Sequence, residues 1–202
     1  MGGENLEEKV QGKLKNELIE WIKAIAFALL VAFVIKSFLF TPVLVKGASM
    51  MPTLEDKDRV IINKIGPKFK SIDRFDVVVV EHVLLNKNEE KNIIKRIIGL
   101  PGDKIEYKDD QLYINGEKYS EPYLDQYKKE LKDSGSLTYD FTLEQILGET
   151  TVPEGDYFVL GDNRRVSKDS RVPEVGFIPK EKIMGTTSII CWPIEHIDLR
   201  FN

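Results

Sequence analysis

The chain has 202 residues, and its 33 acidic and 29 basic side chains leave a net charge of −4 with the histidines neutral. This length suits one compact domain with a short appendage. Hydrophobic residues at 42% and charged residues at 31% exclude both wholesale disorder and a polytopic membrane protein. The mildly acidic balance also argues against nucleic acid as the main partner. One cysteine and two histidines exclude an intrachain disulfide and a Cys-rich zinc site.

The N-terminal region changes character at residue 21. Residues 1–20 form a polar tail with five glutamates and three lysines, whereas residues 21–41 are predominantly apolar and carry only Lys23 and Lys36 as charged side chains. At about 1.5 Å per residue, a helix over this stretch measures roughly 32 Å, close to a hydrocarbon core of about 30 Å. The lysine side chains can bring their ammonium groups to the two interfaces, and Pro42 should end the helix. We therefore expect a transmembrane anchor over residues 21–41.

Two other interpretations of this region stay open. Its longest run without a charge, residues 24–35, is about the size of a signal-peptide core or of a buried helix in a soluble domain. The preceding segment is net negative, and Lys46 disrupts the small-x-small site that would end at Ala48, which argues against a cleaved signal peptide. Lysines flank the region on both sides, so the positive-inside rule does not fix its orientation.

Short β-rich runs separated by turn residues follow Pro42. The Asn115-Gly116 pair between two such runs predicts a type I′ hairpin. No long amphipathic helix lies between the runs, so we expect residues 42–202 to form a mainly antiparallel β domain. The predicted strands, rich in Val, Ile and Tyr, are residues 43–45, 59–63, 76–83, 92–98, 104–107, 112–114 and 157–160.

Residues 121–150 interrupt this β pattern. Residues 128–135 are highly charged, which is typical of a solvated segment. Thr142 and Gln145 can form a capping box at the start of a short helix that ends before Gly148. We interpret residues 121–150 as a surface insertion between core strands.

Polar residues that could carry chemistry gather in three segments, residues 47–54, 95–103 and 161–171. Each segment follows an apolar run and leads into a turn. Rigid scaffolds usually place their functional groups in such positions, at the ends of buried strands. Common nucleotide, dinucleotide and zinc motifs are absent: the sequence contains no phosphate-binding loop ending in Gly-Lys-Ser/Thr, no G-x-G-x-x-G, no H-E-x-x-H and no C-x-x-C.

Lys95 lies in an unusual setting for a lysine. Strand alternation places it on one face with Ile93 and Ile97, and places Arg96 on the opposite face. If the Lys95 face is buried, desolvation favours the neutral amine, and lowering its pKa from about 10.4 to near 7 corresponds to about 4 to 5 kcal/mol. A neutral lysine is a general base. A lysine on an edge strand, in contrast, would only protect that edge against aggregation.

Ser49 is the candidate nucleophile among the hydroxyl side chains. Gly47 allows close backbone approach in its turn, and Pro52 stiffens the exit from it. A neighbouring histidine or lysine base would be needed to activate the hydroxyl, and without one Ser49 is an ordinary turn serine. His82 follows an apolar run and His196 lies in the C-terminal tail, so we expect both to be structural.

Together these segments resemble the type I signal peptidases, membrane-anchored serine endopeptidases that remove signal peptides from exported proteins. The similarity covers residues 20 to about 190, and the short chain with one apolar span looks more like the Gram-positive forms than the larger two-span enzymes. The matching residues are, in order, Ser49-Met50-Met51-Pro52-Thr53-Leu54, the block from Lys95-Arg96 to Gly102-Asp103, and Gly161-Asp162-Asn163-Arg164 with Ser167, Asp169, Ser170 and Arg171.

The resemblance implies a role for each matching residue. Ser49 would be the nucleophile and Lys95 the general base, while Ser167 would hydrogen-bond and orient the lysine amine. It implies an antiparallel β domain on the extracytoplasmic face of the cell membrane, with the N-terminus in the cytoplasm. Substrates would be signal peptides of secreted preproteins, bound by strand addition, with small residues at the first and third positions before the cut. No metal or organic cofactor is implied. Supporting polar contacts would come from Asp162, Asp169, Arg171 and Arg96.

Two positions depart from the family pattern. Some members carry a serine hydroxyl two residues before the nucleophile as part of the oxyanion hole, and Gly47 occupies that position here. The oxyanion would then depend on backbone N–H groups, including that of Ser49. In the third segment, Arg165-Val166 replaces a commoner acidic and amide pair, which leaves the contacts of Arg165 open.

Two other classes of function are compatible with the same residues. A different Ser-Lys peptidase on a similar β core, such as a self-cleaving repressor-like protein, would carry a DNA-binding domain where this chain has its apolar stretch. A non-enzymatic, membrane-tethered β module would use the three segments only as turns and ion pairs. Met50 and Met51 suggest an apolar rim that could touch lipid, and core packing explains them equally well.

Overall fold

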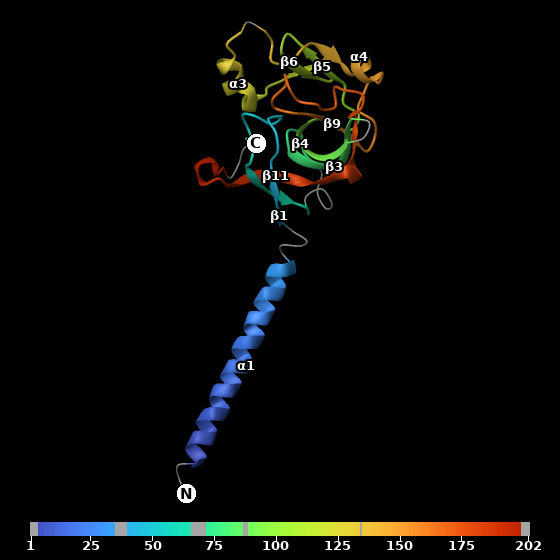
Figure 1. Ribbon diagram of the computed structural model, residues 1–202. Helices are drawn as coiled ribbons and strands as arrows, with labels where there is room; N and C mark the ends of the chain where they lie inside the picture. Colours follow the sequence, from blue (N-terminus) through green and yellow to red (C-terminus); the bar gives the residue numbers. More distant parts are fainter. Residues whose placement is uncertain (1–3, 35–39, 66–71, 87–88, 134, 199–202) are drawn as a thin grey trace. The chain divides into compact units, whose positions relative to one another are not determined.

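The computed structural model describes residues 4–34, 40–65, 72–86, 89–133 and 135–198 (Figure 1). The chain divides into two units, Met1–Phe40 and Thr41–Asn202.

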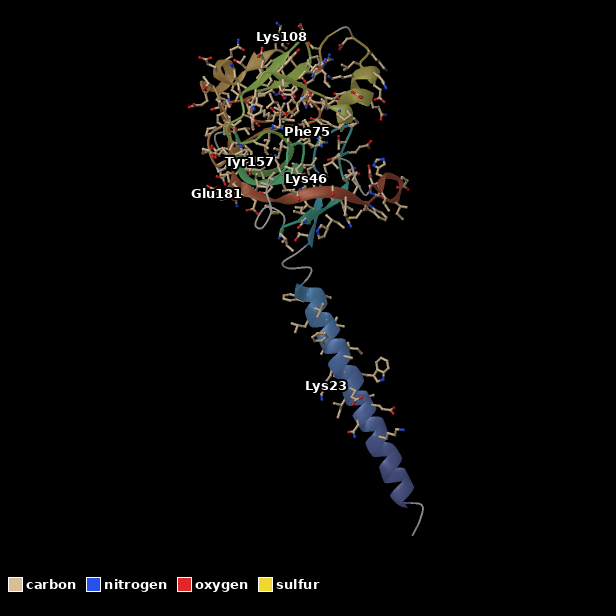
Figure 2. The ribbon with its side chains drawn as sticks, turned by 180° about the vertical axis from the view of Figure 1, so that it is seen from behind. Lys23, Lys46, Phe75, Lys108, Tyr157 and Glu181 are labelled. Atoms are coloured by element: carbon tan, nitrogen blue, oxygen red, sulfur yellow. The ribbon has the colours of Figure 1, made fainter. Side chains whose placement is uncertain are left out.

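The first unit contains one helix, α1 (Glu4–Val34). It begins within the segment predicted as a polar tail, because Glu, Lys and Leu are good helix formers. Lys23 lies on this helix (Figure 2), and the side chains of residues 16–33 are exposed. Within the part of the chain that the structure describes, no helix combines the length and the apolar character needed to cross a bilayer. The expected anchor, residues 21–41, extends over residues 35–39, which lie outside the described residues.

The second unit is mainly antiparallel β structure, as predicted. Figure 1 shows its smaller sheet and strand β11 at opposite ends of the unit, and Figure 2 places Lys108 and Glu181 at these two ends. The smaller sheet has the order β7 (Glu117–Tyr119), β6 (Gln111–Ile114), β5 (Ile105–Lys108) and β8 (Phe141–Thr142). The larger sheet has the order β1 (Phe40–Leu44), β2 (Arg59–Asn63), β11 (Ile183–Trp192), β3 (Val77–Asn86), β4 (Glu89–Gly99), β9 (Asp156–Leu160) and β10 (Ile178–Pro179).

Every predicted strand is present in the structure, but β8, β10 and β11 were not predicted. Each of the seven predicted runs overlaps a strand, from β1 to β6 and at β9. The sequence analysis missed β11, which pairs with both β2 and β3. Its buried face carries Gly185 and Thr187 between Ile183 and Ile190, so the apolar alternation that made the other strands recognisable is interrupted.

The interior has three clusters of buried side chains. One lies between the two sheets and combines Ile98, Phe158 and Leu160 of the larger sheet with residues such as Ile105 and Leu112 of the smaller one. A second includes Ile93 and Ile97 of β4, so this strand is covered on both faces. The third packs residues 45–54, just after β1, against β2, β3 and β11. Ile94 of β4 also packs against this third cluster, so β4 and residues 45–54 share part of the core.

Two local predictions from turn and cap residues are confirmed. Asn115 and Gly116 have φ values of 54° and 85°, as a type I′ turn between β6 and β7 requires. Helix α4 (Leu143–Leu147) begins with the Thr142–Gln145 capping box and ends at Gly148 in the left-handed conformation.

Residues 121–150 are more than a surface insertion. The segment contains the 3-10 helix η2 (Pro122–Leu124), helix α3 (Asp125–Glu130), strand β8 and helix α4. Many of its charged side chains are exposed, yet Glu121, Leu124, Leu137, Thr138 and Phe141 are buried. The hydrophobic residues between the charged ones anchor the segment in the core, and β8 extends the smaller sheet beside β5.

Candidate active site

The turn that carries Ser49 is anchored in the core by its own neighbours. Met50 and Leu54 are 1% and 0% exposed and pack in the third cluster. The idea of a lipid-touching rim is therefore wrong for Met50, whereas Met51 is 37% exposed. Gly47 has a φ of 86°, and its N–H donates to Asp56 Oδ1 at 2.8 Å, which closes the loop below the turn. Ser49 is thus presented from a fixed backbone.

Lys95 is buried on an interior strand. It lies on β4 opposite Val78 of β3, with β9 on the other side, and it is 2% exposed. The edge-strand interpretation is therefore wrong, and the buried alternative holds. Its Nζ lies 2.8 Å from Ser49 Oγ and 2.9 Å from the carbonyl oxygen of Ile94. The structure brings the two predicted residues into direct contact across 46 positions of sequence.

Burial changes the proton affinity of this amine. Desolvation lowers the pKa of Lys95 from 10.5 to about 8, although the negative charges of Asp169 and Asp162 raise it, and the positive charge of Arg171 contributes to the lowering. A substantial fraction of the amine is therefore neutral near pH 8. A neutral amine at hydrogen-bond distance can accept the proton of the Ser49 hydroxyl.

Asp162 joins the segments that carry the two groups. Its carboxylate forms a two-point ion pair with Arg96, in which Nε lies 2.9 Å from Oδ1 and Nη2 lies 2.7 Å from Oδ2. Thr53, at the end of the Ser49 turn, donates its hydroxyl to Asp162 Oδ2 at 2.5 Å. Both charged side chains are fully buried, so this pair is shielded from solvent. Asp162 therefore fixes β4 and the serine turn to the end of β9.

Asp169 and Arg171 form a second buried pair next to the first. Arg171 Nε lies 2.8 Å from Asp169 Oδ1, and Arg171 Nη2 also donates to the carbonyl oxygen of Arg164 at 2.7 Å. Asp169 Oδ2 accepts the N–H of Gly161 at 3.0 Å. The two residues hold the loop after β9 in place.

Ser167 does not make the hydrogen bond expected of it. The Lys95 amine contacts Ser49 and the Ile94 carbonyl, and Ser167 Oγ is buried without a hydrogen-bond partner among the described residues. Its position is nevertheless close to the site. A Cβ atom on Gly161 would lie 2.2 Å from Ser167 Oγ and 2.4 Å from the Ser49 carbonyl oxygen, so only glycine fits where β9 passes the serine turn.

Asn163 is a site residue to which the sequence analysis gave no role. Its Nδ2 donates to the carbonyl oxygen of Ala48 at 3.0 Å, and its backbone N–H donates to the carbonyl oxygen of Ser49 at 3.1 Å. Tyr127 donates its hydroxyl to Asn163 Oδ1 at 2.8 Å. Its position between Asp162 and Arg164 in the third segment could have identified Asn163 as a site residue. Nothing in the local sequence identifies Tyr127 as one.

The two arginines after Asn163 connect the third segment to residues 121–138. Arg164 is buried, and its Nη2 lies 2.5 Å from Glu121 Oε1, while its Nη1 contacts the Tyr107 hydroxyl at 2.7 Å. Burial alone would raise the pKa of Glu121, but the charge and hydrogen bond of Arg164 outweigh it and hold that pKa below its usual value. Arg165, whose contacts the sequence left open, forms a two-point pair with Asp133 at 2.7 and 2.8 Å.

The histidines make contacts with carboxylates. His82 Nδ1 lies 3.4 Å from Glu90 Oε2, and His196 Nδ1 lies 3.2 Å from Asp58 Oδ1. The hydrogen bond that the His196 ring donates to the Asp58 carboxylate raises the pKa of His196. The sequence analysis expected both histidines to be structural, and in the structure both side chains take part in ion pairs at the surface. Across the described residues, no group of three His, Cys, Asp or Glu side chains could hold a metal ion.

Comparisons with known proteins identify relatives of the chain. The chain matches a family model described as signal peptidase, peptidase S26, over residues 18–192. It is 45% identical to signal peptidase I of Bacillus licheniformis, over 95% of this chain and 97% of that protein, and 42% identical to signal peptidase IB of Staphylococcus aureus (strain MRSA252), over 94% and 97%. A crystal structure of a signal peptidase I from Enterococcus faecalis V583 is 43% identical and has a TM-score of 0.52, covering 58% of this chain and 97% of that one.

Proposed function

Because the chain belongs to the signal peptidase family, peptidase S26, we propose that it removes signal peptides from exported preproteins with a Ser49–Lys95 dyad while anchored in the membrane. It is a serine endopeptidase by family, which leaves the repressor-like peptidase and the non-enzymatic module without support. The observation that carries the dyad is the 2.8 Å contact between the buried Lys95 amine and the Ser49 hydroxyl.

In the proposed mechanism one amine serves both halves of the reaction. Lys95 accepts the Ser49 proton as the hydroxyl oxygen attacks the scissile carbonyl carbon, and the ammonium then protonates the leaving amine. The resulting ester between Ser49 and the signal peptide is attacked by a water molecule that gives its proton to Lys95. Breakdown of this second intermediate returns the proton to Ser49 and releases the signal peptide carboxylate.

The oxyanion would be held by backbone donors, because Gly47 supplies no hydroxyl. The Ser49 N–H belongs to a turn whose neighbours Met50 and Leu54 are buried, so its position is set by core packing. In other enzymes, removing one oxyanion-hole donor costs about 3 to 4 kcal/mol of transition-state stabilisation. Asp162, Asp169, Arg96 and Arg171 support the site through the two buried ion pairs.

The proposed substrate region is an extended segment that binds by strand addition, with small residues at the first and third positions before the cut. This preference follows from the resemblance stated above. Signal peptides present such a segment directly after their apolar core.

The pH dependence of cleavage tests the function and the assigned base. The purified full-length chain in detergent should cleave a preprotein after its signal peptide, and kcat/KM should rise about tenfold per pH unit below the Lys95 pKa and level off above it. The direction follows because the base acts as the neutral amine, and burial has lowered its pKa to about 8. The Ser49→Ala variant provides the control. If kcat/KM stays constant from about pH 5 to about pH 8 while the protein remains folded over that range, Lys95 is not the general base.

We further propose that residues 21–41 anchor the chain, with residues 1–20 in the cytoplasm and residues 42–202 on the extracytoplasmic face. The apolar composition of this stretch supports the anchor. The full chain should then float with lipid vesicles in a density gradient. Replacing both Leu29 and Phe33 by Arg should release it, because each central charge costs about 2.5 to 3.5 kcal/mol in a membrane-spanning helix.

A matched double substitution in the polar tail, Asn16→Arg with Gln11→Arg, should leave flotation unchanged. Protection of residues 42–202 from protease added to the cytoplasmic side would support the orientation. Wild-type protein that stays at the bottom of the gradient would contradict the anchor.

A further inference from the structure

Asn163 holds the two peptide groups on either side of Ser49. Its side-chain Nδ2 donates to the Ala48 carbonyl oxygen at 3.0 Å, and its backbone N–H donates to the Ser49 carbonyl oxygen at 3.1 Å. Asn163 is 8% exposed, so these bonds form largely away from water, where an unpaired carbonyl is costly. The backbone of the nucleophile is therefore tied directly to the loop after β9.

Peptide planarity gives the bond to Ala48 a chemical consequence. The Ala48 carbonyl and the Ser49 N–H belong to one planar trans peptide group and point in opposite directions. A donor that fixes the direction of the carbonyl therefore also fixes the direction of the N–H. Lys95 contacts the Ser49 hydroxyl from β4, so the side chain and the backbone of Ser49 are held by different elements.

Tyr127 sets the orientation of the Asn163 amide. Its hydroxyl donates to Asn163 Oδ1 at 2.8 Å. An amide oxygen engaged in this way leaves the amide NH₂ to face the Ala48 carbonyl. Tyr127 lies on α3, and the Arg165–Asp133 pair ties the chain just after α3 to the same loop. Part of the segment predicted as a surface insertion thus contacts Asn163, which in turn contacts the serine turn.

We propose that Asn163 and Tyr127 are positioning residues that direct the Ser49 N–H toward the oxyanion of the reaction. The inference rests on the proposed function, because it requires Ser49 to be the nucleophile. Neither side chain touches the reacting atoms. Tyr127 orients Asn163, Asn163 orients the Ala48–Ser49 peptide group, and that group supplies the donor.

Two substitutions and their combination test this chain of contacts in the full-length protein. Asn163→Leu keeps the approximate volume and the backbone N–H but removes both side-chain hydrogen bonds. Its kcat should fall about 10- to 100-fold, because small displacements of a positioned group have effects of this size. KM should change by about twofold or less, since the lost stabilisation belongs to the transition state. The apparent pKa of the pH profile should stay at the wild-type value, because the Lys95 contacts are intact.

Tyr127→Phe should lower kcat about 3- to 10-fold in the wild-type background and cause no further loss in the Asn163→Leu background, since residues that act in series are not additive. A merely structural tyrosine would lower kcat by the same factor in both backgrounds. Tyr113→Phe, on β6 in the smaller sheet, is the matched control and should retain wild-type kcat.

An unchanged kcat in Tyr127→Phe, a loss confined to KM, or equal losses in the two backgrounds would each overturn the inference. Tyr127→Phe removes a single hydroxyl from a half-buried side chain, so the test stands even if Asn163→Leu fails to fold. Cleavage that survives Ser49→Ala would instead overturn the proposed function. The two failures are therefore distinguishable.

Discussion

Replacing Ser49 by alanine should abolish preprotein cleavage, with kcat/KM falling by about 10⁴-fold or more, as expected for the loss of a catalytic nucleophile. Lys95→Met should have an effect of the same size, because methionine fills a similar volume in the core and cannot accept a proton. In the proposed mechanism the two residues act as one unit across a 2.8 Å contact, so the double variant should be no worse than either single variant. Cleavage of a purified preprotein, followed by gel electrophoresis, measures all three.

The matched control for the lysine is Lys104→Met. Lys104 is exposed and follows the turn after β4, so its replacement should leave kcat/KM at the wild-type value. Thermal unfolding should show that each variant is folded. Appreciable turnover by folded Lys95→Met would remove the lysine from the mechanism and leave Ser49 without its base.

Arg96→Met should strongly lower the free energy of unfolding of the second unit, Thr41–Asn202. The guanidinium forms a two-point pair with Asp162, and both side chains are fully buried. Removing the cation leaves a buried carboxylate without its partner, which costs about 3 to 5 kcal/mol in the free energy of unfolding. The loss should appear as a lower denaturant midpoint at an unchanged slope. Urea unfolding followed by tryptophan fluorescence measures it.

Arg165→Met is the matched control for this prediction. Arg165 forms an ion pair of the same two-point geometry with Asp133, but that pair is exposed to solvent. Its loss should change the unfolding midpoint much less, because water and ions screen an exposed pair. Replacing Arg96 and Asp162 together by apolar residues should restore part of the stability lost in Arg96→Met. Equal midpoint shifts for Arg96→Met and Arg165→Met would contradict the argument from burial.

The sequence was sufficient for the parts of the fold with strong local signals. The Asn115-Gly116 hairpin, the Thr142 cap and the strand around Lys95 each depend on neighbouring residues, and the structure contains all three. Strand β11 was missed because its inward positions include Gly185 and Thr187, which pack well only when β2 and β3 lie on either side.

In the candidate site, too, local features could be predicted from the sequence and contacts between distant segments could not. Strand alternation separated Lys95 from Arg96 and raised the question of its burial, but only the sheet order shows that β4 is an interior strand. The contact between Ser49 and Lys95 joins two segments 46 positions apart, so no local pattern predicts it, and the resemblance supplied the pairing. The bond expected from Ser167 is absent among the described residues. Asn163 was missed because its contacts, to the backbone of Ala48 and Ser49 and to the Tyr127 hydroxyl, join residues far apart in the sequence.

The order of strands in the larger sheet also determines how the two candidate reactive groups come together. The serine turn lies between β1 and β2, the lysine lies on β4, and β11 is the strand that joins these two halves of the sheet. It is the last strand of the described chain, so Ser49 and Lys95 both precede in the sequence the strand that lies between β2 and β3. Because β11 pairs with β2 on one side and with β3 on the other, the half that carries Ser49 and the half that carries Lys95 belong to one sheet only through this strand.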